Sequence, residues 1–278
     1  AVQNVLDKID CVKSIPFMLI QLGAVAGLFF LDFSWKALGL VVATYYFRMW
    51  ALTTTHHRYF AHRSFKTSRV FQFILAFIAS TNVQKGVLWW AANHRHHHRY
   101  SDMPEDIHSP VQRGFWYSHV GWILTNRYEE TKYDQIRDFT KYPEIVWLNK
   151  FWIVPVSTYV LTMYAIGGMN AVFWGFIFST AVLFHGTACV NSLLHVWGTK
   201  RYKTTDESRN NLWVALITTG EGWHNNHHYY MNSARQGFFW WEIDVSYYVL
   251  KLFEMVGLVW DVRVPPEHIL HPTSDRLA

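Results

Sequence analysis

The sequence predicts an all-α membrane protein in which four transmembrane helices carry a cytosolic helical cap that holds a di-metal site. Three observations support this fold class. Four apolar segments are long enough to cross a bilayer, only 16% of the 278 residues are charged, and 16 residues are histidine. The mean hydropathy of +0.00 indicates a large polar part beside the apolar segments. A hydrophobic content of 51% excludes an intrinsically disordered chain.

The predicted spans form two helical hairpins. The hydrocarbon core of a bilayer is about 30 Å thick and requires about 20 apolar helical residues. The predicted transmembrane helices cover residues 15–31, 35–52, 147–166 and 171–190. Residues 32–34 connect the first pair and residues 167–170 the second, and such short connections join antiparallel helices. Core helices of a soluble protein are the alternative, which Trp and Tyr residues near the segment ends disfavour.

Lysine and arginine residues predict the orientation of these spans. Residues 53–144 contain twelve of them, whereas the two short connections contain none. Cytoplasmic segments carry the excess of Lys and Arg, so the cap, residues 53–146 and 191–278, should face the cytoplasm. We expect one integral multi-pass membrane domain over residues 1–278, with an uncleaved first span, in a bacterial plasma membrane or the endoplasmic reticulum. Arg48, near the cytosolic end of its span, is expected to snorkel toward the interface.

Charge and cysteine content argue against several other classes. The formal net charge is only +5, which is weak support for a nucleic-acid partner, and none is expected. Cys11 and Cys189 are far apart and form no CxxC pair, so the chain offers neither a disulfide framework nor a thiolate metal site. The sequence also contains no HPGG haem-binding segment.

Histidines gather in four clusters at or beyond the predicted cytosolic ends of the spans. The clusters contain His57 and His62; His94, His97 and His98; Asn191 and His195; and His224, His227 and His228. Residues three or four apart share one face of a helix, so each triplet can direct two or three imidazoles toward one point. The other histidines are interpreted differently: His185, His268 and His271 as structural, and His108 and His119 as candidate supporting groups.

Nine converging imidazoles exceed the ligands of one metal ion, at most about six, and imply two ions or a large surplus. Imidazole suits zinc, copper, iron and nickel. Structural zinc usually includes cysteine ligands and catalytic zinc keeps few protein ligands, so neither accounts for this set. Two iron ions with an open position for O2 fit the count, and Asn191, a poor direct ligand, could hold a metal-bound water. Carboxylates that could accept the second imidazole N–H are Asp102, Glu105, Asp106, Asp206, Glu221 and Asp244.

At these clusters the chain resembles a membrane fatty acyl desaturase of the stearoyl-CoA desaturase type. The matching stretches are HRYFAHRSFKT (57–67), WAANHRHHHRYS (90–101), RGFWYSHVGW (113–122), NSLLHVWG (191–198) and GEGWHNNHH (220–228). The resemblance implies two iron ions, Fe2+/Fe3+, held by nine catalytic histidines, with a water held by Asn191. Those metal ligands are His57, His62, His94, His97, His98, His195, His224, His227 and His228.

The resemblance also implies a narrow, bent tunnel for the acyl chain. Trp90 and Thr187 would lie at the bend and Gln84 nearer the acyl carbonyl. Met49 falls where the tunnel is expected to close between the second and fourth helices, so a bulkier residue there would shorten the accepted chain. Two basic residues, Arg95 and Arg127, are expected to contact the head group. The predicted substrate-binding residues are therefore Gln84, Trp90, Arg95, Arg127, Thr187 and Met49.

Two departures from the family pattern concern the second cluster and the head group. Asn93 stands before the second cluster, where the family often has Asp. The animal enzymes have a pair of basic residues that contacts the CoA phosphates, and only one of the pair, Arg127, is present here. Arg95 matches another basic residue of the family. A head group of CoA, carrier protein or glycerolipid is therefore compatible with the sequence.

The resemblance implies desaturation of a saturated long-chain acyl group, with Δ9 as the first choice for a cis double bond. The reaction would use O2 and two electrons from a cytochrome b5, ferredoxin or rubredoxin type of donor, beside membrane lipids. No amino-acid side chain breaks an unactivated C–H bond, so the metal must supply that chemistry while the protein positions the substrate. Basic residues that could attract an acidic donor are Arg63, Lys66, Arg69, Lys200, Arg201 and Lys203. Ordinary positive-inside charge also accounts for most of them.

Three alternatives stay open at the level of sequence. The same centre could catalyse acyl hydroxylation, acetylene formation or oxidative decarboxylation, because the outcome depends on small differences in substrate placement. A histidine-rich membrane metal transporter would need ionisable residues along a path through the spans, whereas these histidines gather at the cytosolic ends. A sensor would use the same metal site without turnover.

Overall fold

The computed structural model describes residues 8–273 and 276–277. The predicted domain over residues 1–278 therefore reaches beyond the described chain at residues 1–7, 274–275 and 278. The described residues are mostly helical, as predicted. Their one sheet has two short antiparallel strands, β1 (Lys66–Thr67) and β2 (Val259–Trp260), with Lys66 opposite Trp260.

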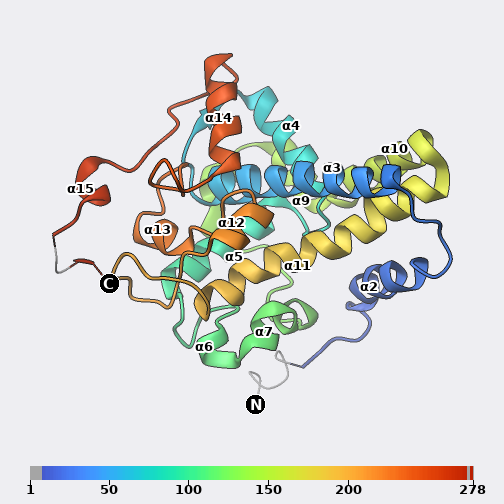
Figure 1. Cartoon of the computed structure of the whole chain (residues 1–278), viewed down its shortest axis with the longest axis horizontal. Helices are drawn as coiled ribbons and strands as arrows, with labels where there is room; N and C mark the ends of the chain where they lie inside the picture. Colours follow the sequence, from blue (N-terminus) through green and yellow to red (C-terminus); the bar gives the residue numbers. More distant parts are fainter. Residues whose placement is uncertain (1–7, 274–275, 278) are drawn as a thin grey trace.

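Four long helices lie together on one side of the molecule, and the smaller elements lie on the other (Figure 1). The long helices are α2 (Ile15–Gly27), α3 (Trp35–Ala51), α10 (Ile153–Val172) and α11 (Ser179–Asn191). α2 ends at Gly27, before the predicted residue 31, and has only 13 residues. The hydroxyl of Ser34 then accepts a hydrogen bond from the Ala37 N–H at 3.1 Å and caps the start of α3.

The predicted second hairpin is present, with its turn at two glycines. Ile153–His195 is the one helical run among the described residues that is long and apolar enough to cross a membrane. Gly167 and Gly168 interrupt it with non-helical backbone angles, and Gly168 has a φ of 60° that favours glycine. Beyond the turn the chain runs back, so that the Tyr159 hydroxyl donates to the Gly175 carbonyl at 3.0 Å. That four helices cross the membrane stays a prediction.

The third predicted span was expected to begin at Trp147, and this prediction is wrong. Trp147 lies on a separate helix, α9 (Pro143–Lys150), and α10 begins only at Ile153. Pro143 favours the first turn of the short helix, and the chain turns at Phe151, where the backbone angles leave the helical region.

α3 continues directly into a π-helix, η1 (Leu52–Ala61), whose ten residues are all buried. π-helical turns are rare and are frequent at functional sites. η1 leads the chain from the bundle of long helices into the cap, and it carries His57 and Arg58 at its centre. The histidines that follow the second predicted span therefore lie in the protein interior.

The cap surrounds η1 with further helices, of which α5 (Val87–Tyr100) has 14 residues and most others are shorter. These are α4 (Arg69–Ser80), α5 (Val87–Tyr100), α6 (Pro110–Arg113), α7 (Phe115–His119), η2 (Gly121–Leu124), η3 (Tyr133–Ile136), α8 (Arg137–Thr140), η5 (Leu193–His195), α12 (Leu212–Ile217), α13 (His224–Tyr229), α14 (Val245–Met255) and α15 (Glu267–Leu270). A second short π-helix, η4 (Phe173–Phe178), precedes α11. The largest apolar cluster joins η1, α4, α5, α9 and α14 through buried residues such as Phe60, Leu75, Leu88, Leu148 and Leu250.

Arg48 does not snorkel, and that prediction is wrong. Its side chain is 0% exposed. The guanidinium donates to the hydroxyls of Ser179 and Thr180, both at 2.8 Å, and to the Thr81 carbonyl at 3.3 Å. It also lies 5.0 Å from the ring centroid of Tyr159. Hydroxyl, carbonyl and aromatic partners inside the bundle satisfy the charge, so the side chain does not reach for the interface.

Replacing this side chain should destabilise the bundle. We expect Arg48→Met to lower the free energy of unfolding by about 2 kcal/mol, because buried hydroxyl and carbonyl acceptors lose their donor. Denaturant titration of the purified protein in detergent measures the change. Lys36→Met, at an exposed position of the same helix, is the control and should shift the free energy by less than about 0.5 kcal/mol. Equal effects of the two variants would contradict a bracing role for Arg48.

Candidate metal centre

The nine predicted histidines divide into two groups. One group of five contains His57, His62, His94, His98 and His227, and one group of four contains His97, His195, His224 and His228. In each group, one ring nitrogen from every histidine lies within 4.8 Å of the others. The groups adjoin, because the ring centroids of His98 and His228 are 4.4 Å apart. Segments from residue 57 to residue 228 thus meet at one place.

Each histidine triplet is shared between the two groups. On α5, His94 and His98 are one helical turn apart and face the first group, whereas His97 faces the second. On α13 the division is reversed, with His227 in the first group and His224 and His228 in the second. The spacing therefore serves two neighbouring sites, with two imidazoles from a triplet at one site and one at the other.

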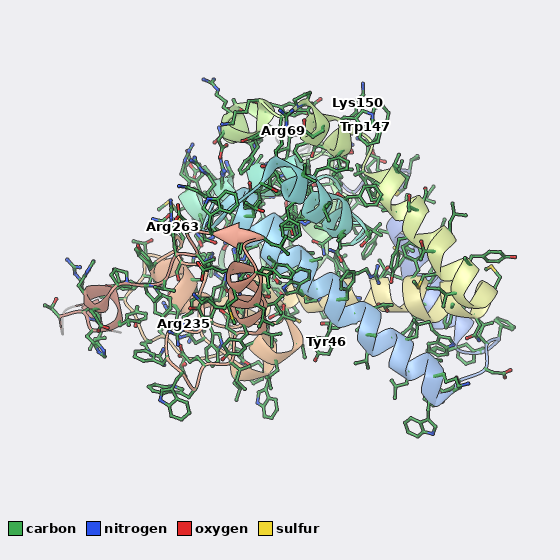
Figure 2. The ribbon with its side chains drawn as sticks, turned by 90° about the horizontal axis from the view of Figure 1, so that it is seen from above. Tyr46, Arg69, Trp147, Lys150, Arg235 and Arg263 are labelled. Atoms are coloured by element: carbon green, nitrogen blue, oxygen red, sulfur yellow. The ribbon has the colours of Figure 1, made fainter. Side chains whose placement is uncertain are left out.

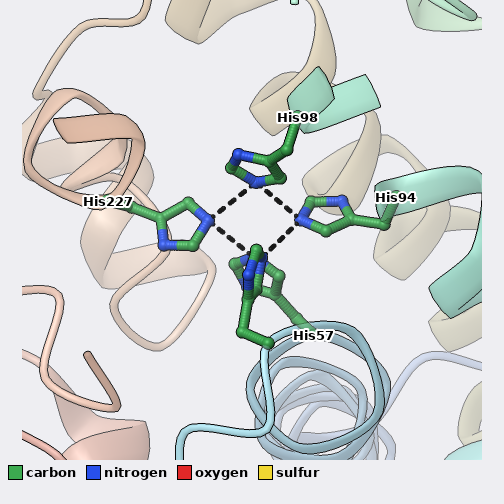
Figure 3. A group of neighbouring side chains, drawn as sticks. His57, His94, His98 and His227 are labelled. Carbon is green, nitrogen blue, oxygen red and sulfur yellow. Dashed lines mark hydrogen bonds between the residues drawn. The ribbon is translucent and has the colours of Figure 1, made fainter. Parts of the chain in front are cut away.

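The ring nitrogens of the first group face one another (Figure 3). Nε2 of His227 lies 3.0 Å from Nε2 of both His57 and His98, and Nε2 of His94 lies 2.9 Å from that of His98 and 3.0 Å from that of His62. Lone pairs that meet head-on repel unless a cation lies between them. Two nitrogens each about 2.1 Å from an ion and at right angles would be about 3 Å apart. The donor set and its spacing fit a metal ion.

Carboxylates support four of the rings from behind. Nδ1 of His97 pairs with Asp106 at 2.9 Å, Nδ1 of His195 with Asp102 at 2.8 Å, and Nδ1 of His228 with Asp206 at 2.7 Å. Nδ1 of His57 contacts Glu221. A carboxylate on Nδ1 fixes the tautomer that leaves the Nε2 lone pair free for a metal.

Two of the six predicted carboxylates have other partners. The backbone carbonyl oxygen of Glu105 lies 2.9 Å from Nε2 of His96, and the Glu105 carboxylate takes no part in this contact. Asp244 pairs instead with Arg58, with 2.9 Å between Nη1 and Oδ1.

Burial and charge set the protonation of these groups. Desolvation lowers the pKa of His62, His94, His98 and His227 well below the usual histidine value, and the pKa of His224 moves in the same direction for the same reason. These rings are therefore neutral at neutral pH, which is the ligating form. Burial alone would raise the pKa of the Asp206 carboxyl, but the charge and hydrogen bond of His228 outweigh it and keep that pKa low.

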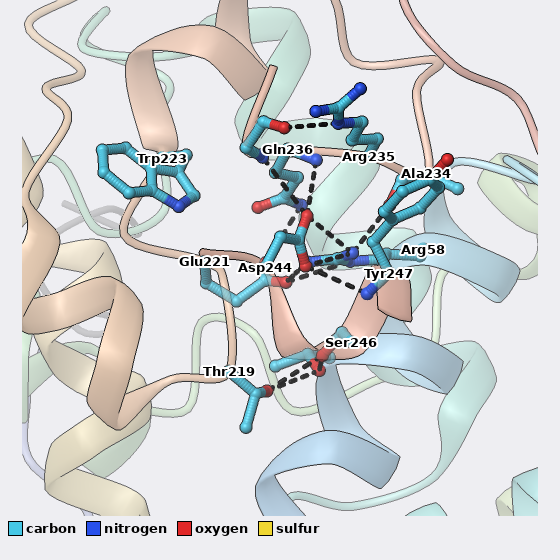
Figure 4. A network of polar contacts seen from close by, with 12 residues as sticks. Arg58, Thr219, Glu221, Trp223, Ala234, Arg235, Gln236, Asp244, Ser246 and Tyr247 are labelled. Carbon is cyan, nitrogen blue, oxygen red and sulfur yellow. Dashed lines mark hydrogen bonds and ion pairs between the residues drawn. The ribbon is translucent and has the colours of Figure 1, made fainter. Parts of the chain in front are cut away.

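A buried arginine holds the carboxylate behind His57 (Figure 4). Arg58 donates to Glu221 Oε1 at 3.0 Å, to the Ala234 carbonyl at 2.6 Å and pairs with Asp244. Gly220 has a φ of 125°, and a side chain there would collide with Asp244. Arg58 is not among the residues predicted for the site, and its one signal in the sequence is its position next to His57.

A cavity of about 320 Å³ reaches the first histidine group. Its lining includes Gln84, Trp90, Thr187, His94 and Asn191. Trp90 stacks on the ring of His94, with 4.8 Å between centroids, and donates to Gln84 Oε1 at 3.2 Å. Gln84 in turn donates to the Thr187 hydroxyl at 3.2 Å. Three residues predicted at or near the bend of a tunnel thus form one hydrogen-bonded wall beside the centre.

The other predicted substrate residues lie elsewhere. Met49 is buried behind Trp90, where it packs with Tyr45 and Leu183. Arg95 holds Asp138 through two hydrogen bonds of 2.9 and 2.8 Å, and it also donates to backbone carbonyls of η1. The Arg127 guanidinium lies 5.7 Å from its neighbour's aromatic ring. Substrate contacts of these residues stay predictions.

The two histidines predicted as supporting groups both line the cavity. The ring of His108 lies against that of His97, tilted by 35° with 4.4 Å between ring centroids, and Asp106 lies close to both. His119 hydrogen-bonds to the Ser192 hydroxyl at 2.8 Å and to His185 at 3.1 Å. His185 is therefore part of a polar chain beside the cavity.

Comparison with known proteins identifies the chain's relatives. The model of the fatty acid desaturase family matches residues 33–253. The chain is 37% identical over 268 residues to Delta-9 acyl-lipid desaturase 2 of Arabidopsis thaliana, covering 94% of this chain and 85% of that protein. It is 37% identical to acyl-CoA C20 Delta5-desaturase of Anemone leveillei, covering 84% and 76%. It is also 37% identical to sn-2 palmitoyl-lipid 9-desaturase of Nostoc sp. (strain 36), covering 86% of each. This chain belongs to the membrane fatty acid desaturase family.

Proposed function

We propose that this protein is a di-iron acyl desaturase that introduces a cis Δ9 double bond into a saturated long-chain acyl group. It would use O2 and two electrons from a separate donor of the cytochrome b5, ferredoxin or rubredoxin type. The observation that carries the proposal is the pair of adjoining groups, five and four histidines, at the end of a cavity with apolar walls. Membership of the family supports the same activity.

The nine histidines would hold two iron ions, and Asn191 a water on one of them. The bound irons would supply the O2-dependent removal of hydrogen from an unactivated C–H bond. The chain's own part is to fix the tautomer and the orientation of the rings. Asp102, Asp106, Asp206 and Glu221 do this by accepting hydrogen bonds from Nδ1 of their partners.

The cavity would position the substrate by depth. Apolar side chains such as Phe17, Ile20, Trp122 and Phe184 line it together with the Trp90 wall. A saturated chain offers no polar handle, so its register against the metal centre depends on where the cavity bends and ends. The same side chains exclude water from the reacting carbons. Met49 would close the distal end, because it packs directly behind Trp90.

The relatives support Δ9 as the first choice and leave two carriers to compare. Two of the named relatives are called Delta-9 or 9-desaturases, and one is a Delta5-desaturase. Their names include both acyl-lipid and acyl-CoA. Assays of the purified enzyme with each carrier, followed by mass spectrometry of double-bond position, distinguish these cases and also separate desaturation from hydroxylation or decarboxylation.

A docking surface for the electron donor would need basic residues that are free to pair with an acidic partner. Most basic residues considered for it form ion pairs within the chain. Examples are Lys66 with Asp261, Arg69 with Glu144 at 2.7 Å and Lys200 with Glu207 at 3.0 Å. Such pairing favours ordinary surface charge for these residues.

The transporter alternative is less well supported. A transport path would place polar ligands along the long helices. The nine histidines instead gather on η1, α5, η5 and α13, beyond the ends of those helices. A metal-sensing role would predict no O2 consumption with acyl substrate, which oxygen measurements on the purified protein can test.

Removing one ligand tests the centre. We expect His97→Ala to lose iron relative to a wild type that carries close to two ions per chain, and to form no monoene, because one of the four donors at its site is gone. Metal analysis and lipid profiling of expressing cells measure both effects. His271→Ala, at an exposed position far from the groups, is the control. An unchanged monoene profile in His97→Ala would refute the proposed role of this ligand.

Removing a supporting carboxylate tests how the rings are held. Asp206→Asn keeps the shape of the side chain but removes the charge that faces His228 Nδ1. Loss of such a partner typically lowers metal affinity by about 10- to 100-fold. A chelator titration of iron retention measures this loss, with Asp261→Asn as the control at an exposed ion pair. Equal retention in both variants would show that the carboxylate does not orient the ring.

Shortening Met49 tests the closed end of the cavity. We expect Met49→Ala to shift the products toward longer acyl chains, because space opens between α3 and α11 beside Trp90. Gas chromatography of the monoenes from cells fed mixed acyl chains measures the shift. Met18→Ala, at an exposed position on α2, is the matched control. A product profile identical to that of the wild type would place the end of the cavity elsewhere.

A further inference from the structure

Helix α14 has an apolar face that no other part of the described chain covers. One side of the helix packs on the protein through Leu250 and Phe253. The exposed residues on another side are Tyr248, Leu252, Met255 and Val256. Met255 is 80% exposed and Leu252 59%, although both are large and apolar. Exposed apolar stripes of this kind mark a contact with another apolar phase.

The third face of α14 is polar. Lys251 and Glu254 pair with each other on it, one helical turn along. The helix therefore presents a packed side, a polar side and an exposed apolar side. This division is typical of helices that lie in a membrane interface, where one uncovered side meets water and the other meets lipid.

α14 lies beside α3 near the end of the predicted second span. The Phe253 ring meets Trp50 at 5.6 Å between centroids, and Trp50 lies 6.2 Å from Phe47, which is itself half exposed. Figure 1 shows α14 crossing the direction of α3. If α3 crosses the bilayer, α14 runs parallel to the membrane plane at the level of residues 47–50. Its exposed face is then continuous with the exposed side of α3.

Helix α12 lies at the same level. The Tyr45 hydroxyl of α3 donates to the Ile217 carbonyl of α12 at 2.8 Å. Trp213 on this helix is 67% exposed, and Leu212 and Ile217 are exposed as well. Tyr46, the exposed neighbour of Tyr45, lies on α3 in Figure 2. Tryptophan and tyrosine gather at the boundary between lipid and water.

Basic residues lie on the opposite side of α14. In Figure 2, Arg235 and Arg263 lie on the side of α14 away from the long helices. Arg263 is exposed. Positive charge on that side suits the head-group layer and the cytosol, and apolar residues on the other suit the acyl chains.

We propose that α12 and α14 form an interfacial shelf, made of Leu212, Trp213, Ile217, Leu252, Met255 and Val256, that is immersed in the cytosolic leaflet. The occupant of this surface is the lipid bilayer itself. The C-terminal part of the cap is thus a monotopic membrane element, and only the rest of the cap stands in the cytosol.

The shelf is joined to the metal centre. Asp244 caps the start of α14, where its side chain accepts a hydrogen bond from the Tyr247 N–H at 3.0 Å. The same carboxylate pairs with Arg58, which holds Glu221 behind His57. Immersion of α14 therefore fixes the height of the histidine groups relative to the membrane surface.

Depth-dependent quenching tests the shelf. In a background with Cys11→Ser and Cys189→Ser, Met255→Cys carries an environment-sensitive fluorophore, and the protein is placed in nanodiscs with one chain per disc. We expect lipids with a nitroxide near the top of the acyl chain to quench this label strongly and aqueous iodide to quench it weakly. Glu254→Cys, on the polar side of the same helix and about 100° around its axis from position 255, is the matched control and should give the opposite order. Leu252→Cys serves as a second reporter if the first variant does not fold.

Each other outcome overturns the proposal. Strong iodide quenching at both positions would place the whole helix in water. Protection of position 255 from both quenchers would mean that protein covers the face. Protection that appears only in a second preparation, with two chains per disc, would identify a second copy of this chain as the occupant. None of these readouts depends on catalytic turnover, so the test is separate from that of the desaturase activity.

Discussion

Crowding of neutral imidazoles, with their Nε2 lone pairs turned inward, is the constraint on which the rest of the structure depends. Nitrogens about 3 Å apart, such as those of His57 and His227, are unfavourable neighbours without a shared cation. The carboxylates behind four of the rings prevent those rings from turning away, since each holds an Nδ1–H outward. Arg58 extends this support to Glu221 and Asp244 and so ties the start of α14 to the same centre.

The long helices and the cap both place residues at the histidine groups. η1 brings His57 and His62 from the end of α3, and α11 ends at Asn191, beside the cavity. Trp90 lies at the junction, because its ring stacks on His94 while its other contacts line the cavity and cover Met49. The cavity therefore reaches the first histidine group directly at His94, with the Trp90 ring beside it.

Spacing predicted that the members of each histidine triplet act together, because local helix geometry places i, i+3 and i+4 side chains on one face. His57 and His62 are five residues apart, and they and His195 completed the set through their place near the same predicted membrane face and through the family resemblance. The division of each triplet between two groups could not be predicted, since it depends on how α5 and α13 pack against each other. The same holds for Arg48, whose buried partners Ser179 and Thr180 are far away in sequence. The predicted first span is longer than α2, because the apolar run continues beyond the last helical residue, Gly27.

The sequence separation of the ligands has a consequence for biosynthesis. The first group needs both His57 and His227, and the supporting Asp244 comes later still. Neither group is complete until most of the polypeptide has left the ribosome, so a metal ion that needs the full donor set of either group can bind only after that set has been synthesised. A nascent chain therefore carries its early histidines, His57 to His98, without the later residues that complete either group.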